Sequence, residues 1–265
     1  MRIYDLIAKK RDGGTHTREE LETIVNGFVS DGDDLILAIA TSPLQAAAAA
    51  TADIPVLGTA VTDYATALEI SDWSGTVGTN VSGTSDLAPL DQQADMLHDL
   101  FPDAKNVGLL YCSAEPNSVY QCTVIEGYLK ELGYNVTWYA FNDTNDVTSV
   151  TETAADNSDV IYIPTDNTAA SNTEAIANVV LAKKVPVIAG EEGIARGCGV
   201  AALSISYYDL GYQTGLMAYD ILANGADVST MAVQTAPSVT KKYNAANAEA
   251  LGITIPDDYE AIAEN

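Results

Sequence analysis

The chain has 265 residues, of which 47% are hydrophobic, and its formal net charge is −25 with only 12 lysines and arginines. This length and hydrophobicity suffice for two α/β lobes with buried cores and argue against global disorder. The excess of acidic residues argues against nucleic acid and anionic membrane surfaces as partners.

The first third of the chain alternates predicted strands with predicted helices. A strand is expected at residues 2–8, and a helix with a capping box and an apolar stripe follows at 17–28. A buried strand covers 35–40, and an alanine-rich helix runs from 43 to 50. The next strand is predicted at 56–60.

The rest of the chain continues this pattern. Further strands are predicted at 79–83, 106–111, 136–141, 160–163, 185–190 and 200–205, with helices that include 90–101, 146–156 and 207–222. Residues 231–265 are expected to form a strand, a polar crossover, a short helix and an acidic tail. Strands that alternate with helices indicate parallel sheets.

Two stretches far apart in the chain have the same order of predicted elements. Residues 34–40 and 159–163 are both apolar strands, each followed by hydroxyl-bearing residues, a helix and a second strand that contains proline. This duplication predicts two lobes of similar topology, one made of residues 1–103 and 200–228 and the other of residues 104–199 and 229–265. Clefts between domains are a preferred place for small ligands.

Polar side chains recur where the predicted strands end, which is where open α/β sheets bind ligands. The candidate ligand-binding residues are Ser42, Thr62, Asp63, Ser85, Asp86, Asn117, Ser118, Thr165, Asp166 and Asn167. Hydroxyl, amide and carboxylate groups without basic residues suit a neutral or zwitterionic ligand and do not suit phosphate. For Asp166 and Asn167, capping of the following helix is an equally good interpretation.

The two charged groups of a zwitterion need different partners. Backbone N–H groups near Asn117 and Ser118 are candidates for a ligand carboxylate, and Asp63, Asp166 or Glu191 for an ammonium group. Tyr64 and Tyr207 are candidates to cover an aromatic ligand side chain, although lone tyrosines beside helix starts are more often ordinary packing.

Catalytic and metal-binding motifs are sparse. The glycines of residues 197–202 match G-x-G-x-x-A by letter, but they precede a predicted strand instead of following one. The sequence has no nucleophile elbow, no phosphate-binding P-loop, two distant histidines and three cysteines without a C-x-x-C pair. We therefore expect a protein without a cofactor or metal that is not an enzyme, with an α/β enzyme using Asp166 or Glu191 as base as a minor alternative.

Seven motifs in a fixed order carry a resemblance to a known family. They are DLILAIATS at 34–42, IPVLGTAVTD at 54–63, VSGTSD at 81–86, VGLLY at 107–111, EPNS at 115–118, YIPTDNT at 162–168 and SYYDLG at 206–211. Together they resemble the substrate-binding proteins of ABC transporters of the tryptophan/tyrosine type.

The resemblance implies a type I periplasmic-binding-protein fold of two doubly wound lobes joined by a hinge. It implies a monomeric extracytoplasmic protein, often a lipoprotein, that closes over an aromatic amino acid and delivers it to permease subunits. A ligand-sensing domain of the same fold serving a signalling receptor is the alternative. The signal segment and first βα unit of the family have no counterpart here, so we expect an incomplete first lobe or an incomplete gene model.

Overall fold

The computed structural model describes Thr17 and residues 34–263, so the strand predicted at 2–8 and, apart from Thr17, the helix predicted at 17–28 lie outside the described residues. The chain divides into two compact units. Unit 1 comprises the described residues up to Asp86 together with Tyr207–Thr235, and unit 2 comprises Leu87–Ser206 and the residues from Ala236 onward.

The sheet of unit 1 is parallel throughout its described strands. Its order is β1 (Ile36–Ile39), β2 (Val56–Val61), β3 (Val81–Ser85) and β9 (Gln234–Thr235). The predicted strands at 35–40, 56–60 and 79–83 are thus confirmed within a few residues. Such apolar runs between turn residues are typical of buried parallel strands.

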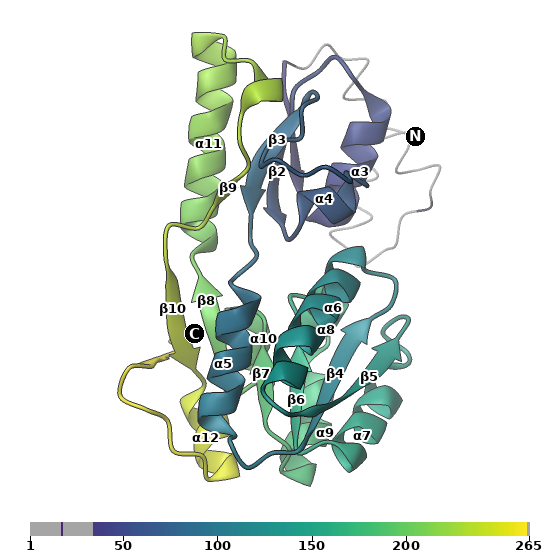
Figure 1. Ribbon diagram of the computed structural model, residues 1–265, viewed down its shortest axis with the longest axis vertical. Coiled ribbons are helices and arrows are strands. Elements are labelled where there is room, and N and C mark those ends of the chain that lie inside the picture. Colours follow the sequence, from purple (N-terminus) through teal and green to yellow (C-terminus); the bar gives the residue numbers. More distant parts are fainter. Residues whose placement is uncertain (1–16, 18–33, 264–265) are drawn as a thin grey trace. The chain divides into compact units, whose positions relative to one another are not determined.

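Helices cover both faces of this sheet (Figure 1). α3 (Thr41–Ala50) and the single turn α4 (Tyr64–Ala67) pack through Leu44 and Tyr64 on the face that carries Ala38 and Val56. α11 (Tyr207–Asn224) and the 3₁₀ turn η1 (Val228–Thr230) pack on the other face around Leu57.

A hydroxyl contact fixes α11 on the sheet. The Thr84 Oγ1 atom of β3 lies 2.9 Å from the Thr214 Oγ1 atom of α11, and both side chains are buried. Buried hydroxyl groups need such partners because an unpaired one is costly. This bond therefore sets where α11 lies along β3 in unit 1.

Unit 2 contains a seven-stranded sheet. Its order is β11 (Glu260–Ala261), β10 (Val239–Tyr243), β8 (Ala201–Ile205), β7 (Val187–Ala189), β6 (Val160–Ile163), β4 (Asn106–Cys112) and β5 (Asn135–Phe141). β10 is antiparallel to β8, which departs from the predicted all-parallel pattern.

The strands of unit 2 are covered by helices on both faces. The helices are α5 (Leu90–Leu100), α6 (Pro116–Glu131), α7 (Val147–Asn157), α8 (Asn167–Ala170), α9 (Thr173–Lys183), α10 (Glu192–Gly197) and α12 (Ala245–Leu251). One core contains Leu110, Ile161 and Val180 and reaches α7 and α9. At β6, the buried Tyr162 hydroxyl donates to Gln93 Oε1 of α5 at 2.7 Å, so α5 covers the opposite face there.

The unit boundaries differ from the predicted lobes 1–103 with 200–228 and 104–199 with 229–265. The chain crosses after Asp86, Ser206 and Thr235 instead. Hydrogen bonding explains the difference: β8 pairs with β7 and β10 of unit 2, whereas β9 pairs with β3 of unit 1. Sequence periodicity identifies a strand but carries little information about which sheet it joins.

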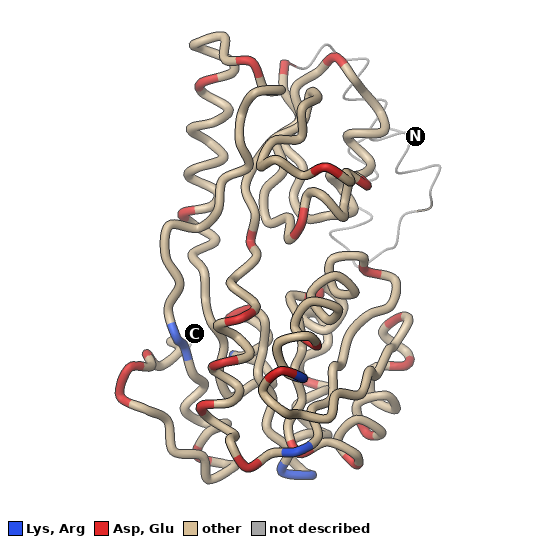
Figure 2. Tube along the Cα trace, viewed as in Figure 1, with Lys and Arg blue, Asp and Glu red and all other residues tan. Residues whose placement is uncertain are grey.

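Charge is distributed unevenly between the units. Among the residues that the structure describes, every lysine and arginine belongs to unit 2 (Figure 2). Unit 1 carries nine acidic residues in its described part, namely Asp34, Asp53, Asp63, Glu69, Asp72, Asp86, Asp209, Asp220 and Asp227.

Candidate functional site

In unit 1 the polar residues predicted from the sequence lie at the carboxyl ends of three adjacent parallel strands. Thr41 and Ser42 begin α3 after β1, Thr62 and Asp63 follow β2, and Ser85 ends β3. The Ser85 Oγ atom donates to the Thr62 carbonyl oxygen at 2.8 Å, which ties the ends of β2 and β3 together. The structure therefore brings these residues to one edge of the sheet.

Asp86, directly after β3, is the most unusual of these side chains. It is 4% exposed, and its Oδ2 atom accepts a hydrogen bond of 3.1 Å from the Tyr207 hydroxyl at the start of α11. Its Oδ1 atom has no hydrogen-bond partner among the described residues. Burial raises the pKa of this carboxyl, and the Thr62 and Tyr207 hydroxyls offset that rise in part. A buried carboxylate oxygen without a donor is costly, so this atom is suited to an incoming cationic or N–H donor.

Asp63, after β2, and Ser42, after β1, have different roles in unit 1. Asp63 caps α4, because its Oδ2 atom accepts a hydrogen bond of 2.7 Å from the Thr66 amide. Ser42 is exposed in the first turn of α3, a helix whose N-terminus has no side-chain cap. Uncapped N–H groups at a helix start favour anions. Asp63 is thus engaged within the protein, whereas Ser42 lies beside amides that are suited to a negative group.

Two of the four non-glycine residues with positive φ in the described part of the chain lie near the same strand ends. Ala40, just before α3, has φ of 77°, and Ala60, two residues before Thr62, has φ of 52°. A non-glycine residue at positive φ costs on the order of 1–3 kcal/mol and is frequent at binding and catalytic sites. Its occurrence before two of the three polar ends supports the assignment of a functional site to this edge of unit 1.

In unit 2 the predicted residues also come together, at the carboxyl ends of β4 and β6. The Asn117 Nδ2 atom donates to the Thr165 carbonyl oxygen at 3.0 Å, and the Gln121 amide pairs with both the N–H and the carbonyl of Thr165. Asn117 and Ser118 are buried in the first turn of α6. The amide groups of this cluster hold the two strand ends together.

Asp166 acts as a helix cap, which is one of the two interpretations open from the sequence. Its Oδ1 atom accepts from the Ala169 amide at 2.8 Å and its Oδ2 atom from the Cys112 amide at 2.7 Å. Burial, together with the nearby charge of Glu115, raises the pKa of Asp166 to about 6. Because both oxygens already accept backbone hydrogen bonds, Asp166 connects β4 to α8.

Glu115 is a central residue of this cluster that the list of candidates from the sequence missed. Its carboxylate accepts hydrogen bonds from the amides and side chains of both Asn167 and Thr168, at 2.7–2.9 Å. Burial works against ionisation, but these four bonds lower the pKa of Glu115. Its position three residues after β4 is the signal that points to it.

Glu191 is engaged in a similar way. It caps α10, where its two carboxylate oxygens accept hydrogen bonds from the Gly193 and Ile194 amides. The sequence analysis named Glu191 as one candidate to bind the ammonium group of a ligand. In the structure its carboxylate stabilises the start of a helix.

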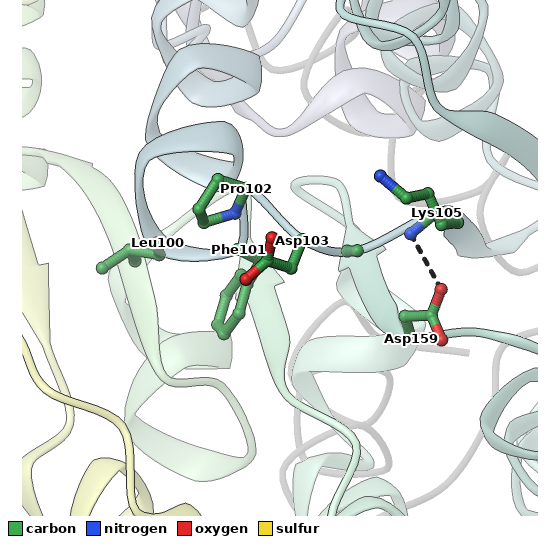
Figure 3. Close-up of a pocket in the computed structure, with 7 residues that line it drawn as sticks. Leu100, Phe101, Pro102, Asp103, Lys105 and Asp159 are labelled. Atoms are coloured by element: carbon green, nitrogen blue, oxygen red, sulfur yellow. Dashed lines mark hydrogen bonds between the residues drawn. The ribbon is translucent and has the colours of Figure 1, made fainter.

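A pocket of about 440 Å³ lies elsewhere in unit 2 (Figure 3). It is lined by Leu100, Phe101, Pro102, Asp103, Ala104, Lys105 and Asp159. These residues precede β4 and β6, whose carboxyl ends lie at the opposite edge of the sheet. Asp159 is already occupied, because it accepts hydrogen bonds from the Lys105 and Asn106 amides. The ligand-binding edge of a doubly wound sheet is at the carboxyl ends of its strands, so this pocket is not the candidate site.

Within residues 34–263 no group of three or more His, Cys, Asp or Glu side chains is arranged to hold a metal ion. None of the helices in this part of the chain has the length and hydropathy that crossing a bilayer requires.

The architecture defines the class. Two α/β units with largely parallel sheets, connected by three chain crossings, form a fold of the type I periplasmic-binding-protein class. The chain belongs to the family of ABC transporter substrate binding proteins, whose family model matches residues 8–265. The fold and family expected from the seven motifs are therefore confirmed.

One known protein similar to this chain is named for an aromatic amino acid. A tyrosine-binding protein of Clostridioides difficile is 36% identical over 214 residues, which cover 81% of this chain and 61% of that protein. The match therefore spans less than two thirds of the relative's length.

Two solved structures are similar to this chain in both fold and sequence. An ABC domain from Streptococcus pneumoniae in complex with L-Trp has a TM-score of 0.85 at 32% identity, covering 91% of this chain and 81% of that one. A ligand-free, open substrate-binding protein with adhesive properties from Clostridium difficile has a TM-score of 0.71 at 33% identity, covering 97% of this chain and 92% of that one.

Proposed function

We propose that this protein is the solute-binding component of an ABC importer and that it binds an aromatic amino acid. The observation that carries the proposal is the buried Oδ1 atom of Asp86, which has no partner among the described residues. An α-ammonium group is the donor that this atom lacks, and it would pair with the carboxylate in a site of low dielectric.

The relatives support the choice of an aromatic side chain. One of them is named for tyrosine, and a solved structure of another contains L-Trp. In this chain, Tyr207 stands beside Asp86 and offers an aromatic surface next to the proposed ammonium site. Backbone amides at the start of α3, which no side chain caps, would bind the ligand carboxylate.

The proposal extends to the setting in which such a protein works. It acts outside the cytoplasm as a monomer, performs no chemical reaction, and delivers its ligand to the permease subunits of the transporter. In unit 2, the strand-end residues Asn117, Ser118, Thr165 and Asn167 are proposed to supply polar contacts to the ligand, and Asp166 is proposed to position them by connecting β4 to α8. Hinge closure of the two units then retains it.

Calorimetry with a matched set of ligands tests the proposal. L-tyrosine, L-tryptophan and L-phenylalanine are expected to bind, whereas N-acetyl-L-tyrosine, which lacks the ammonium group, is expected to bind at least about 30-fold more weakly. Glucose and ribose serve as neutral controls. Binding of a sugar without binding of any aromatic amino acid would remove the proposed ligand class.

A further inference from the structure

Gln93, on α5 of unit 2, is a buried side chain whose amide group joins two distant parts of the chain. Its Oε1 atom accepts a hydrogen bond of 2.7 Å from the Tyr162 hydroxyl of β6, and its Nε2 atom donates to the Ala88 carbonyl oxygen at 3.2 Å. Gln93 and Tyr162 are 0% exposed, and Ala88 is 2% exposed. Glutamine is mostly found on protein surfaces, because burying its amide is costly unless the amide is hydrogen-bonded. A buried glutamine that uses both ends of its amide therefore indicates that these two bonds have a specific role.

The segment that contains Ala88 leads from β3 to α5 and is the first of the three chain crossings between the units. On the side of unit 1, the Asp86 amide donates to the Val61 carbonyl oxygen of β2 at 3.3 Å. On the side of unit 2, Gln93 holds the carbonyl group of Ala88. A single residue, Leu87, thus separates two anchored positions of this crossing.

The other two crossings are held in unit 2 by paired strands. Ser206 alone leads from β8 to α11, and residues 236–238 lead from β9 to β10. Ile205 of β8 and Val239 of β10 are register partners, so the sheet fixes both crossings where they enter unit 2. The first crossing enters unit 2 at the start of α5, where the described residues provide neither a strand partner nor a side-chain cap. The bond from Gln93 supplies the anchor that the sheet gives to the other two crossings.

We propose that Gln93 is a positioning residue for ligand binding, which fixes the unit 2 end of the first crossing and so limits the hinge of that crossing to Leu87. The inference rests on the proposed function, because a hinge matters for binding only if the protein closes over its ligand. Through Tyr162, the same amide is tied to β6, which leads three residues later to Thr165 of the polar cluster. One side chain therefore holds both the crossing that starts at Asp86 and the strand that leads to the ligand-binding residues of unit 2.

Loss of this anchor should weaken ligand binding without removing any group that is proposed to contact the ligand. In the ligand-free protein, the backbone around Ala88 would gain freedom, and closure over a ligand would remove that freedom again. Fixing the backbone of one residue changes an equilibrium constant by about 5- to 30-fold. Because the anchor favours the closed state, its loss should appear mainly as faster dissociation of the ligand.

The test compares three variants of the full chain. Gln93→Met keeps the length of the side chain and removes both hydrogen bonds. Tyr162→Phe is the milder change, because it leaves the bond from Gln93 to Ala88 in place and removes only the hydroxyl that orients the amide. Tyr134→Phe is the matched control, since the Tyr134 hydroxyl is also buried in unit 2 and donates to the Phe101 carbonyl oxygen, at the other end of α5.

Two measurements on these variants separate positioning from stability. Urea unfolding is expected to show similar losses of stability for Tyr162→Phe and Tyr134→Phe, since each removes one buried hydroxyl. Calorimetry and stopped-flow dissociation with L-tyrosine should show affinity about 5- to 30-fold weaker for Gln93→Met, an intermediate loss for Tyr162→Phe and no loss for Tyr134→Phe. Unchanged affinity of Gln93→Met, or equal losses for the two tyrosine variants, would overturn the proposal.

Hydrogen exchange of the ligand-free chain tests the anchor independently of any ligand. The peptide that contains residues 87–93 should exchange at least about fivefold faster in Gln93→Met than in the wild type, and at the wild-type rate in Tyr134→Phe. Unchanged exchange in Gln93→Met would overturn the anchor. If the wild type bound no aromatic amino acid, the proposed function would fail, and this exchange measurement would still decide whether Gln93 fixes the crossing.

Discussion

The Tyr207 hydroxyl donates a hydrogen bond of 3.1 Å to the Asp86 carboxylate, across 121 positions of sequence within unit 1. Asp86 ends the first segment of this unit and Tyr207 begins the second. The bond therefore joins the two segments where the proposed ammonium site lies. It also leaves the Oδ1 atom of Asp86 as the acceptor for a ligand.

Replacing Tyr207 by phenylalanine is expected to raise the pKa of Asp86 further, because the tyrosine hydroxyl stabilises the charged carboxylate. Tyrosine binding at neutral pH should then weaken by about 3- to 30-fold, as expected when one hydrogen bond to a charged group is lost. Calorimetry over a range of pH should show that the loss grows as the pH falls, because a higher pKa leaves less of Asp86 ionised. Tyr208→Phe, at an exposed neighbour, is the control and should leave the affinity unchanged.

Ligand affinity should itself depend on pH through Asp86. Only the ionised carboxylate pairs with an ammonium group, and burial places the pKa of Asp86 above the usual 3.8. Affinity is therefore expected to fall as the pH decreases through this raised pKa. Asp86→Asn should bind weakly at every pH and show a flat profile. If the affinity of the wild type were equally independent of pH, ligand binding would not depend on the ionisation of Asp86.

Much of the fold could be predicted from the sequence, because buried parallel strands are short apolar runs between turn residues. The strands at 36–39, 56–61 and 106–112 were all expected within a few residues. The sheet to which each strand belongs could not be predicted, because it depends on hydrogen bonds between distant segments. β8 and β9 show this, since each pairs with strands of the unit opposite to the predicted one.

The candidate site could likewise be predicted from the sequence only in part. The rule that polar residues follow strands located Thr62, Ser85 and Asp86 at one edge of unit 1. It did not distinguish a carboxylate that caps a helix, such as Asp63, from one with an unpaired buried oxygen, such as Asp86. That difference arises from burial and from Tyr207, which lies far along the chain.

The Asp166 and Glu115 pair predicts how stability depends on pH. The raised pKa of Asp166 means that its contribution to stability is fully present below pH 3.8 and is lost as the pH rises through about 6. The lowered pKa of Glu115 acts oppositely, with stability present above pH 4.5 and lost as the pH falls. The two effects together place a stability maximum in the mildly acidic range.

Urea unfolding of the wild type and of Asp166→Asn checks this expectation. The wild type should lose about 1.4 kcal/mol of unfolding free energy between pH 5 and 7.5 from this group, relative to the variant. Ser171→Ala, at the end of α8, is the control and should follow the wild-type slope. Parallel pH profiles of the wild type and Asp166→Asn would show that Asp166 does not titrate in this range.

Substitution of Gly83 is expected to lower the free energy of unfolding strongly. It lies in β3 in register with Gly58, and its φ is 144°, a conformation that residues with a Cβ rarely adopt. A Cβ here would overlap the Gly58 carbonyl oxygen and the Tyr64 hydroxyl. Gly83→Ala should therefore cost about 3 kcal/mol or more of unfolding free energy, from strain and overpacking together.

Gly75→Ala separates these two causes. Gly75 also has a positive φ, of 92°, but a Cβ there would meet no atom within 4 Å. Its substitution should cost only the backbone strain, about 1 kcal/mol. Chemical denaturation of both variants measures the difference directly. Equal losses at the two positions would mean that the close approach of β2, β3 and Tyr64 does not constrain Gly83.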